Sequence, residues 1–394
     1  MNYKHNIIIV GSGLVGMAFA LSLSKKKINV TILEKNSKSD FLKYKDLRTS
    51  AISQGSSRIL TKIGIWEKII NQAQPINEIK VSEGNNFSGI EFKSSLLGEG
   101  PLGYIVNNSL LKKVFYKELF QSKYINFIDE IKIKGISSNS QNVIINSNKG
   151  KLCSPLVVGA DGRYSEMRYM ANIKYLRHNY KQIAFVFNIK HNKSHNATAL
   201  EKFYPSGPLA LLPMIQNNGC SSSIVWTVDE SKKEKYLNKK MFLDDLNKKY
   251  LNEFGKIKEL TAPVIYNLNL FSCYDYYKER VVLIGDACQA IHPIAGQGLN
   301  LGLRDSYELT KSIVNGYKLG LDVGSNTVLR NYAQTRIIDK NMLITATHRL
   351  NQLFSNNSLF FKKLRERGLK IFNKSNFLKK QSMLFAMGLK SPNF

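Results

Sequence analysis

Three glycines near the start of the chain have the spacing of a phosphate-binding turn. Gly11, Gly13 and Gly16 follow the apolar run 6–10 and open a stretch, 14–25, with a helical pattern. In that setting one glycine permits a tight turn, one lets the backbone approach a pyrophosphate, and one allows close helix packing. The N–H groups at the start of the helix would then hold the phosphates. The pattern predicts a nucleotide-binding strand, turn and helix.

A carboxylate stands where such a unit would bind a ribose. Glu34 ends a second apolar run, 29–33, at roughly the 20-residue separation that this kind of fold requires. The carboxylate can accept hydrogen bonds from a ribose 2′-hydroxyl, whereas it would repel a 2′-phosphate. The predicted site therefore suits FAD or NAD rather than NADP.

Two later segments each place an aspartate directly after an apolar run. Asp161 and Gly162 follow the first of these runs, although an Asp-Gly pair at a strand end is often only a turn. Gly285 and Asp286 follow the second run, and a glycine-rich loop and a helical stretch come next. One carboxylate can bind a polyol hydroxyl there, while free backbone N–H groups face an anionic acceptor. A flavin offers both partners. The loop and helix start contain His292, Pro293, Gly296, Gln297, Gly298, Leu299 and Asn300.

The elements that would position these residues indicate an α/β fold with two domains. The first 33 residues read as a βαβ unit, and the strand, turn and helix pattern returns after Arg280, with a helix over about 299–313. Between them, the β-branched and aromatic runs 182–190 and 222–228 predict an antiparallel sheet. We expect a Rossmann-like FAD-binding domain, an inserted antiparallel-sheet substrate domain and a helical C-terminal segment. The expected divisions are 1–75, 101–175 and 275–345 for the first domain, 76–100 and 176–274 for the second, and 346–394 for the segment.

Bulk properties narrow the class of protein. No apolar run reaches the roughly 20 residues needed to cross a bilayer, and the run 7–23 lacks a cleavage site for a targeting signal. The net charge of +28 suits an anionic membrane or a nucleic acid, but the abundance of Lys, Asn and Ile together is equally typical of a genome of low GC content. Without an RNA-binding signature, no nucleic-acid partner is expected. Four isolated cysteines predict neither a disulfide framework nor a metal site, and they fit a reducing cytoplasm.

Together these motifs resemble those of a known enzyme family. GSGLVG, GADG and GDACQAIHPIAGQGLNLGLRD are similar to the flavin-dependent aromatic hydroxylases typified by para-hydroxybenzoate hydroxylase. The narrower resemblance is to the ubiquinone-biosynthesis branch, and it covers nearly the whole chain. It rests also on the segments 46–53 (DLRTSAIS), 103–106 (GYIV), 205–213 (PSGPLALLP) and 364–369 (LRERGL).

The resemblance implies roles for individual residues. Gly11, Gly13, Gly16 and Glu34 would bind the ADP half of FAD, Arg48 would reach its central portion, and Asp286 would bind the ribityl chain or the pyrophosphate. Gly298, Leu299 and Asn300 would present backbone groups to the isoalloxazine ring. Asp161 and Gly162 belong to a motif linked with both FAD and NAD(P)H. Where many members of the branch have Glu before Asn, this chain has Asn107 and Asn108, so no cofactor contact is expected there.

The sequence leaves two alternative roles open for His292 and for the candidate substrate-pocket residues. His292 could act as an acid or base, since imidazole titrates near neutrality, but the resemblance favours a structural role in the flavin loop beside Pro293. His178, His191 and His195 lie in polar stretches, and we expect them at the surface. Leu211, Leu212 and Pro213 are candidates to line the substrate pocket, and a plain core role is the alternative.

The resemblance implies a reaction as well. A hydride from NAD(P)H would reduce FAD, and O₂ would then hydroxylate an aromatic ring of a polyprenylated ubiquinone precursor through a flavin C4a-hydroperoxide. A catalytically silent flavoprotein that scaffolds a quinone-biosynthesis complex is one alternative, and another flavin-dependent aromatic hydroxylase is a second. Flavin-dependent halogenases fit less well, because their paired-tryptophan motif is missing. A lipid-soluble substrate also favours a peripheral position on the inner membrane face, with the basic, apolar segment 359–380 as the docking surface.

Overall fold

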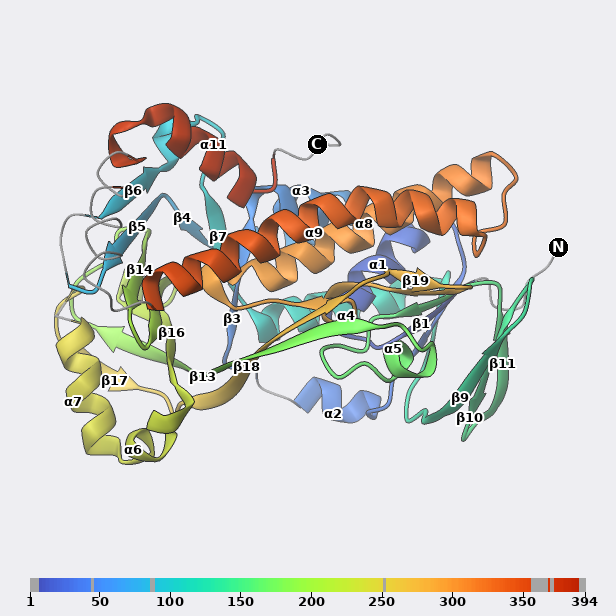
Figure 1. Ribbon diagram of the computed structural model, residues 1–394, viewed down its shortest axis with the longest axis horizontal. Coiled ribbons are helices and arrows are strands. Elements are labelled where there is room, and N and C mark those ends of the chain that lie inside the picture. The colour runs from blue at the N-terminus through green and yellow to red at the C-terminus, as the bar shows by residue number, and fades with distance from the viewer. Residues whose placement is uncertain are drawn as a thin grey trace.

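The protein is built around two β-sheets that lie end to end, with two long helices running past both (Figure 1). The computed structural model describes residues 7–43, 46–85, 89–250, 253–355, 368 and 372–389. In this part of the chain, no helix is both long enough and apolar enough to span a bilayer.

The first sheet has six strands in the order β19-β20-β12-β1-β2-β8. All neighbouring pairs are parallel except β19 and β20. Its central strands are short, fully apolar and covered on both faces, as buried parallel strands require. The strands are β1 (Ile7–Val10), β2 (Val30–Leu33), β8 (Ile125–Ile128), β12 (Val157–Gly159), β19 (Tyr277–Lys278) and β20 (Val281–Leu283).

Helices and two small sheets surround this first sheet. Helix α1 packs between α4 and α8, and α8 packs in turn on α9. The helices are α1 (Leu14–Ser24), α2 (Lys38–Lys43), α3 (Gln54–Lys62), α4 (Asn108–Gln121), α5 (Glu166–Met170), α8 (Gln297–Lys318) and α9 (Asn326–Ser355). The small sheets are β9 (Ile133–Ser138), β10 (Val143–Ser147) and β11 (Gly150–Ser154), and β3 (Thr49–Ser53), β4 (Gln74–Ile76) and β7 (Gly103–Asn107).

The second large sheet has nine strands and is mostly antiparallel, which confirms the sheet predicted for the middle of the chain. Its order is β21-β18-β13-β16-β15-β14-β5-β6, with β17 also paired to β13. Strands β14 and β5, far apart in sequence, pair in parallel. The strands are β5 (Glu78–Glu83), β6 (Ile90–Lys93), β13 (Tyr175–His191), β14 (Thr198–Tyr204), β15 (Gly207–Met214), β16 (Ser221–Asp229), β17 (Ile257–Leu260), β18 (Val264–Cys273) and β21 (Gln289–Ala290).

The two faces of this sheet differ in composition. The outer face packs on α6 (Lys233–Leu237) and α7 (Lys239–Tyr250), and it buries large aromatic side chains such as Phe185, Phe187 and Trp226. Because side chains alternate along a strand, the residues between them point to the opposite side. We call that side the inner face. Its members on β13 to β16 are Ala184, Val186, Asn188, Ala199, Glu201, Phe203, Ala210, Leu212, Ser223, Val225 and Thr227.

The inner face looks toward the parallel-sheet domain. Leu212 packs in one cluster with Ala51, and Phe203 packs in another with Ile294. The strand pairing is consistent with the expected division into domains, because β5 and β6 join strands that come more than 80 residues later. The division itself remains a proposal.

Two histidines expected at the surface are in fact buried. His191 is 2% exposed and His195 is 3% exposed. The His191 ring lies within hydrogen-bond distance of the Lys193 carbonyl and the Ser222 hydroxyl, and Nε2 of His195 lies 2.9 Å from the Met214 carbonyl. The expectation was wrong because polar neighbours in sequence do not exclude a buried imidazole whose nitrogens find partners. His178 is exposed, as expected.

Candidate flavin site

The glycine turn lies between β1 and α1 and leaves open space at one position. Gly11 has a φ of +103°, and a Cβ there would lie 2.5 Å from the Ala160 carbonyl oxygen. A Cβ on Gly16 would lie 2.2 Å from the Gly11 carbonyl oxygen. Gly13, by contrast, would point a Cβ into space with nothing within 4 Å, at a helix N-terminus that no side chain caps. Gly11 and Gly16 therefore serve close packing, and Gly13 borders the space where an anion can approach.

Glu34 lies beside that turn and is 6% exposed. One carboxylate oxygen accepts hydrogen bonds from the Ser12 backbone N–H at 2.9 Å and from the Ser12 hydroxyl at 2.7 Å. The other accepts from the backbone and side-chain nitrogens of Asn36, both at 3.0 Å. These contacts fix the carboxylate next to the turn and occupy its four usual lone-pair sites, so a ribose hydroxyl would have to share or replace one of them.

The Asp161-Gly162 turn reaches the same edge of the sheet. Strands β2, β1, β12 and β20 are neighbours in that order and run in parallel, so their carboxyl ends meet there. Asp161 accepts a hydrogen bond from the Met167 N–H at 3.0 Å through one oxygen, whereas the other oxygen is buried and has no hydrogen-bond partner among the described residues. Burial raises the pKa of the Asp161 carboxyl. Gly162 has a φ of +81° and nothing near its Cβ position.

A buried arginine that sequence reasoning missed ties two of these segments together. The Arg168 guanidinium is 4% exposed and donates to the carbonyls of Ala287 and Arg163, both at 2.9 Å. It therefore joins the turn after β12 to the turn after β20. No spacing rule in the sequence distinguishes this arginine from the many surface arginines and lysines.

Asp286 lies at the end of β20, and the glycine before it fits closely against α1. Burial raises the pKa of the Asp286 carboxyl, while the positive charges of Arg163 and Arg48 oppose that rise. Gly285 has a φ of +61°, and its Cβ would lie 3.2 Å from Val15. The aspartate is therefore held at the point where β20 approaches the glycine turn.

A largely buried ion-pair network holds the turn after β20. The Asp305 carboxylate accepts a hydrogen bond from the Gly285 N–H at 3.0 Å and from Nε of Arg336 at 2.7 Å. Arg336 also pairs with Asp339, which pairs in turn with Arg304. Asp305 is the last residue of the GLNLGLRD motif, and this was the only sign in the sequence of its importance. Its partner Arg336 lies 31 residues further on, and the packing of α8 on α9 brings the two residues together.

The start of α8 presents free backbone groups to the same region. Gly296 precedes the helix with a φ of +60°, no side chain caps the helix, and a Cβ on Gly298 would meet nothing within 4 Å. The Asn300 side chain accepts from the Ser53 N–H at 2.9 Å and donates to the Ala51 carbonyl at 2.8 Å. Asn300 thus anchors β3 to the helix, and the N–H groups of Gly298 and Leu299 in its uncapped first turn are in position to donate to a ligand.

Arg48 lies on the far side of the site, at the start of β3. Its guanidinium forms a two-pronged pair with Asp46, with distances of 2.8 and 2.7 Å, and lies over the Tyr266 ring at 5.5 Å from the centroid. The pair with Arg48 and Lys112 holds the pKa of Asp46 at about 2, against the effect of burial. A charged, oriented guanidinium therefore borders the site near Asp286.

His292 is a buried residue of the flavin loop with one hydrogen-bonded nitrogen. It is 1% exposed, Nε2 lies 3.2 Å from the Gln182 side-chain oxygen, and its ring lies edge-on to Tyr180 at 5.1 Å. Burial lowers the pKa of His292 to about 4. The ring is therefore neutral near pH 7. A neutral, packed ring joining the loop to β13 supports the structural role, with Pro293 continuing the loop toward Gly296.

The three candidates for the substrate pocket separate onto different surfaces. Leu211 points to the outer face and packs in the aromatic core. Leu212 belongs to the inner face, is partly exposed, and packs in the same cluster as Ala51. Pro213 follows Leu212 on the outward side of the strand. Of the three, Leu212 is the side chain placed toward the flavin loop.

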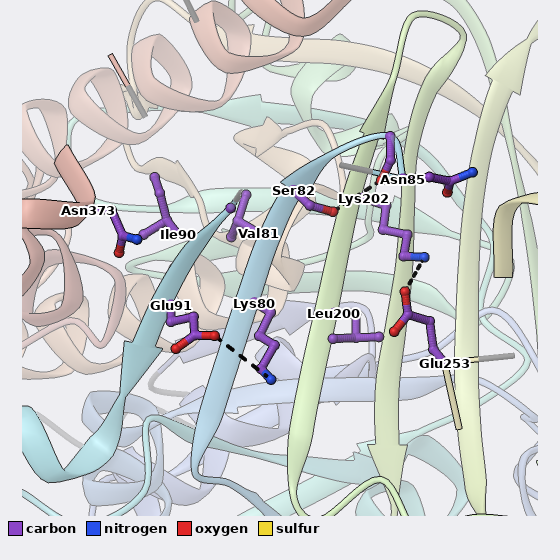
Figure 2. Close-up of a pocket in the computed structure, with 12 residues that line it drawn as sticks. Lys80, Val81, Ser82, Asn85, Ile90, Glu91, Leu200, Lys202, Glu253 and Asn373 are labelled. Atoms are coloured by element: carbon purple, nitrogen blue, oxygen red, sulfur yellow. Dashed lines mark hydrogen bonds and ion pairs between the residues drawn. The ribbon is translucent and has the colours of Figure 1, made fainter. Parts of the chain in front are cut away.

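A cavity of about 440 Å³ lies elsewhere, at the β5 and β6 edge of the second sheet (Figure 2). Its lining includes Leu200 and Lys202 from the outward side of β14, and Glu253, which forms an ion pair with Lys202. Figure 2 shows these side chains turned toward the cavity. It is therefore separate from the site at the carboxyl edge of the parallel strands.

The convergent residues fit a flavin dinucleotide. Gly13 leaves a cradle at an uncapped helix N-terminus, which suits a pyrophosphate. Glu34 at the end of β2 suits a ribose, and Asp286 suits a polyol hydroxyl. The free N–H groups at the start of α8 suit the electron-rich edge of a flavin ring. These residues would hold FAD along the carboxyl edge of the first sheet.

Comparison with known families and sequences agrees with this site. A family model described as an FAD binding domain matches residues 4–337. A ubiquinone hydroxylase, UbiL, of Rhodospirillum rubrum is 32% identical over 387 residues, which are 97% of this chain and 89% of that protein. The 3-demethoxyubiquinol 3-hydroxylase of Escherichia coli is 28% identical over 98% of this chain and all of its own length.

Solved structures share the fold at lower sequence identity. The p-nitrophenol 4-monooxygenase PnpA of Pseudomonas putida has a TM-score of 0.84 at 17% identity, with both chains fully covered. PqsL of Pseudomonas aeruginosa has a TM-score of 0.78 at 16% identity, over 93% of this chain and 99% of that one. The fold is therefore one that also occurs in these two proteins.

Proposed function

This chain belongs to the family of FAD-dependent hydroxylases of ubiquinone biosynthesis, and on that basis we propose that it hydroxylates the aromatic ring of a polyprenylated ubiquinone precursor. Its cofactor is FAD, and NAD(P)H and O₂ are the co-substrates. The observation that carries the proposal is the position of the flavin loop, 292–300, between the FAD-binding turns and the inner face of the second sheet. A ring bound on that face would lie against the flavin.

The chemistry of the reaction comes from the cofactor, which when bound accepts hydride and activates O₂. The chain's own residues bind and orient. With the cofactor bound, the N–H groups of Gly298, Leu299 and Asn300 would stabilise negative charge on its ring edge, and Asp286 would hold its polyol chain. Packing of the inner face over the loop excludes water from the reacting ring.

Membrane contact is part of the proposal, because a polyprenylated substrate dissolves in lipid. Most of the docking segment 359–380 lies outside the described residues. Of its described part, Phe372 packs edge-on against Phe92 at 6.1 Å, whereas Phe377 is 69% exposed and Leu378 is 41% exposed. Two exposed apolar side chains beside Lys379 and Lys380 support contact by the start of α11 (Asn376–Ala386) with an anionic lipid surface.

Quinone profiling of a strain that lacks this chain tests the proposed function. The strain should lose ubiquinone and accumulate a prenylated precursor that lacks one ring hydroxyl. Complementation with the unchanged chain should restore ubiquinone, and complementation with Gly13→Val should not. An unchanged quinone profile in the deletion strain would contradict the proposal.

A further inference from the structure

One carboxylate on the inner face forms no ion pair with any of the described residues. Glu201 lies in the middle of β14, paired with Ala210 on β15 and Val81 on β5. None of the hydrogen bonds or ion pairs of the described residues involves its side chain, and the residue remains partly exposed. Its neighbours Leu200 and Lys202 point away from it, toward the cavity in Figure 2.

The position of Glu201 along β14 places it over the flavin loop. Two residues before it, Ala199 packs in the cluster that contains Ala51, and a Cβ on Gly296 would lie 3.0 Å from the Ala51 Cβ. Two residues after it, Phe203 packs in the cluster that contains Ile294. Since alternate residues of a strand share a face, Glu201 looks toward the segment 294–296 from between these two contacts.

The surrounding inner face has the character of a ring-binding surface. Ala184 and Ala210 are small, and Val186 and Val225 offer apolar contact. Buried polar atoms also lie on this face without hydrogen-bond partners among the described residues: Oγ of Ser223, Oγ1 of Thr227 and Oδ1 of Asn188. Unpaired polar atoms among small side chains are what a ligand bearing hydroxyl groups would complete.

We propose that Glu201 is the proton acceptor for the phenolic hydroxyl of the substrate ring. The carboxylate accepts a hydrogen bond from the ring O–H in the bound state. As the ring is hydroxylated, the O–H bond breaks, its electron pair stays on the ring oxygen and enriches the attacked carbon, and the proton moves to the Glu201 carboxylate. The proton is returned to the product oxygen or to water. This inference rests on the proposed function, because it requires a phenolic substrate on the inner face.

Electrostatics support the assignment. Burial, with no contribution from a neighbouring charge, raises the pKa of Glu201 to about 7. A base whose pKa lies near the working pH is the most effective one. Its strand partners Val81 and Ala210 are apolar, and Phe203, two residues further on, packs with Ile294 and Phe354. Among the described residues of β5, the next charged side chain on this face is Glu83, opposite Phe203.

The test uses the FAD-loaded protein and 2-prenylphenol as the probe, and it compares two variants. Glu201→Gln keeps a hydrogen-bond acceptor but cannot take the proton, so KM should stay within about twofold while kcat falls roughly 100-fold at pH 7.5. Glu201→Leu removes the acceptor as well. Wild-type kcat should rise with pH through about 7, as the carboxylate ionises, and this rise should be absent in Glu201→Gln.

Binding without turnover gives a second readout. The dissociation constants of 2-prenylphenol and its methyl ether are measured from the change in flavin absorbance. Wild type and Glu201→Gln should bind the phenol more tightly than the ether, and Glu201→Leu should bind both equally. Glu91→Gln, which changes an exposed carboxylate of the same domain, is the matched control and should resemble wild type. An unchanged kcat and pH profile in Glu201→Gln, with wild type active, would overturn the inference about Glu201. A wild-type protein that binds FAD but hydroxylates no phenol would instead refute the proposed function.

Discussion

At the scale of single residues, the site depends on which positions are open and which are packed. Three glycines of one motif have different functions. Gly11 and Gly16 allow the backbone to approach itself, whereas Gly13 borders free space. The same distinction separates His292, a neutral ring enclosed by protein, from Glu201, a carboxylate that forms no ion pair within the described part of the chain.

Substitutions at two of these glycines should have opposite signatures. Gly13→Val should leave the melting temperature of the apoprotein unchanged, since its side chain meets no protein atom, and should weaken FAD binding at least about tenfold by occupying the pyrophosphate cradle. Gly16→Val should destabilise the apoprotein by roughly 1–3 kcal/mol or more through overpacking. Flavin titration and thermal denaturation separate the two. Full FAD occupancy in Gly13→Val would show that this turn does not bind the pyrophosphate.

His292 should make stability depend on pH. Its pKa is lowered from 6.5 to about 4 in the folded protein, so the unfolded chain binds a proton that the folded one does not. Stability should therefore fall as the pH drops from about 6.5 to about 4, by a total of roughly 3 kcal/mol from this group. His191 and His195 have lowered pKa values too, so the contribution of His292 is the difference between wild type and His292→Gln in urea unfolding across that range. Parallel curves would show that His292 is not buried in neutral form.

At the scale of elements, the packing of α8 on α9 controls the turn after β20. Asp305 joins three elements, since it accepts hydrogen bonds from Gly285 and from Arg336 while lying within α8. Arg304 and Arg336 are both buried, and two carboxylates compensate them. The cofactor contact proposed for Asp286 would thus depend on Asp305 and Arg336, which lie on α8 and α9.

Removing the acid at Asp305 should affect both stability and cofactor binding. Asp305→Ala leaves Arg336 with one carboxylate partner and frees the Gly285 N–H, so the free energy of unfolding should fall by about 3–5 kcal/mol and FAD affinity should fall with it. Asp339→Ala removes the other partner of Arg336 without touching Gly285. It should destabilise the protein, but FAD affinity should be retained under conditions in which the variant is fully folded. Equal loss of FAD affinity in both variants would contradict the specific role of Asp305.

Elements with a local signal could be predicted from the sequence, and those that depend on remote pairing could not. The turn at Gly11 to Gly16 and the carboxylate Glu34 follow from spacing along one βαβ unit, and the structure has α1 end within one residue of the prediction. Glu201 gave no signal, because a charged residue in a strand usually marks a solvent-exposed face. Only the pairing of β14 with β5, which are more than 100 residues apart, encloses it.

At the scale of the whole molecule, the net charge and one exposed apolar surface support the proposed contact with a membrane. The chain has a net charge of +28, and the start of α11 exposes Phe377 and Leu378 next to two lysines. Replacing Lys362, Lys363, Lys379 and Lys380 with Gln should weaken co-sedimentation with anionic liposomes at low salt, since each basic residue near such a surface contributes about 1 kcal/mol. Neutral liposomes are the control. Unchanged binding to anionic vesicles would exclude the segment 359–380 as the docking surface.

The central claim, that this molecule is an FAD-dependent monooxygenase acting on a phenolic ring, is tested most directly by the fate of labelled oxygen. The FAD-loaded protein is incubated with NADPH, 2-prenylphenol and ¹⁸O₂, and the product is analysed by mass spectrometry alongside a peroxide assay. The fold and site predict a product that carries one ¹⁸O atom, formed in step with NADPH consumption. NADPH consumption that yields only labelled hydrogen peroxide and leaves the phenol unchanged would contradict the claim.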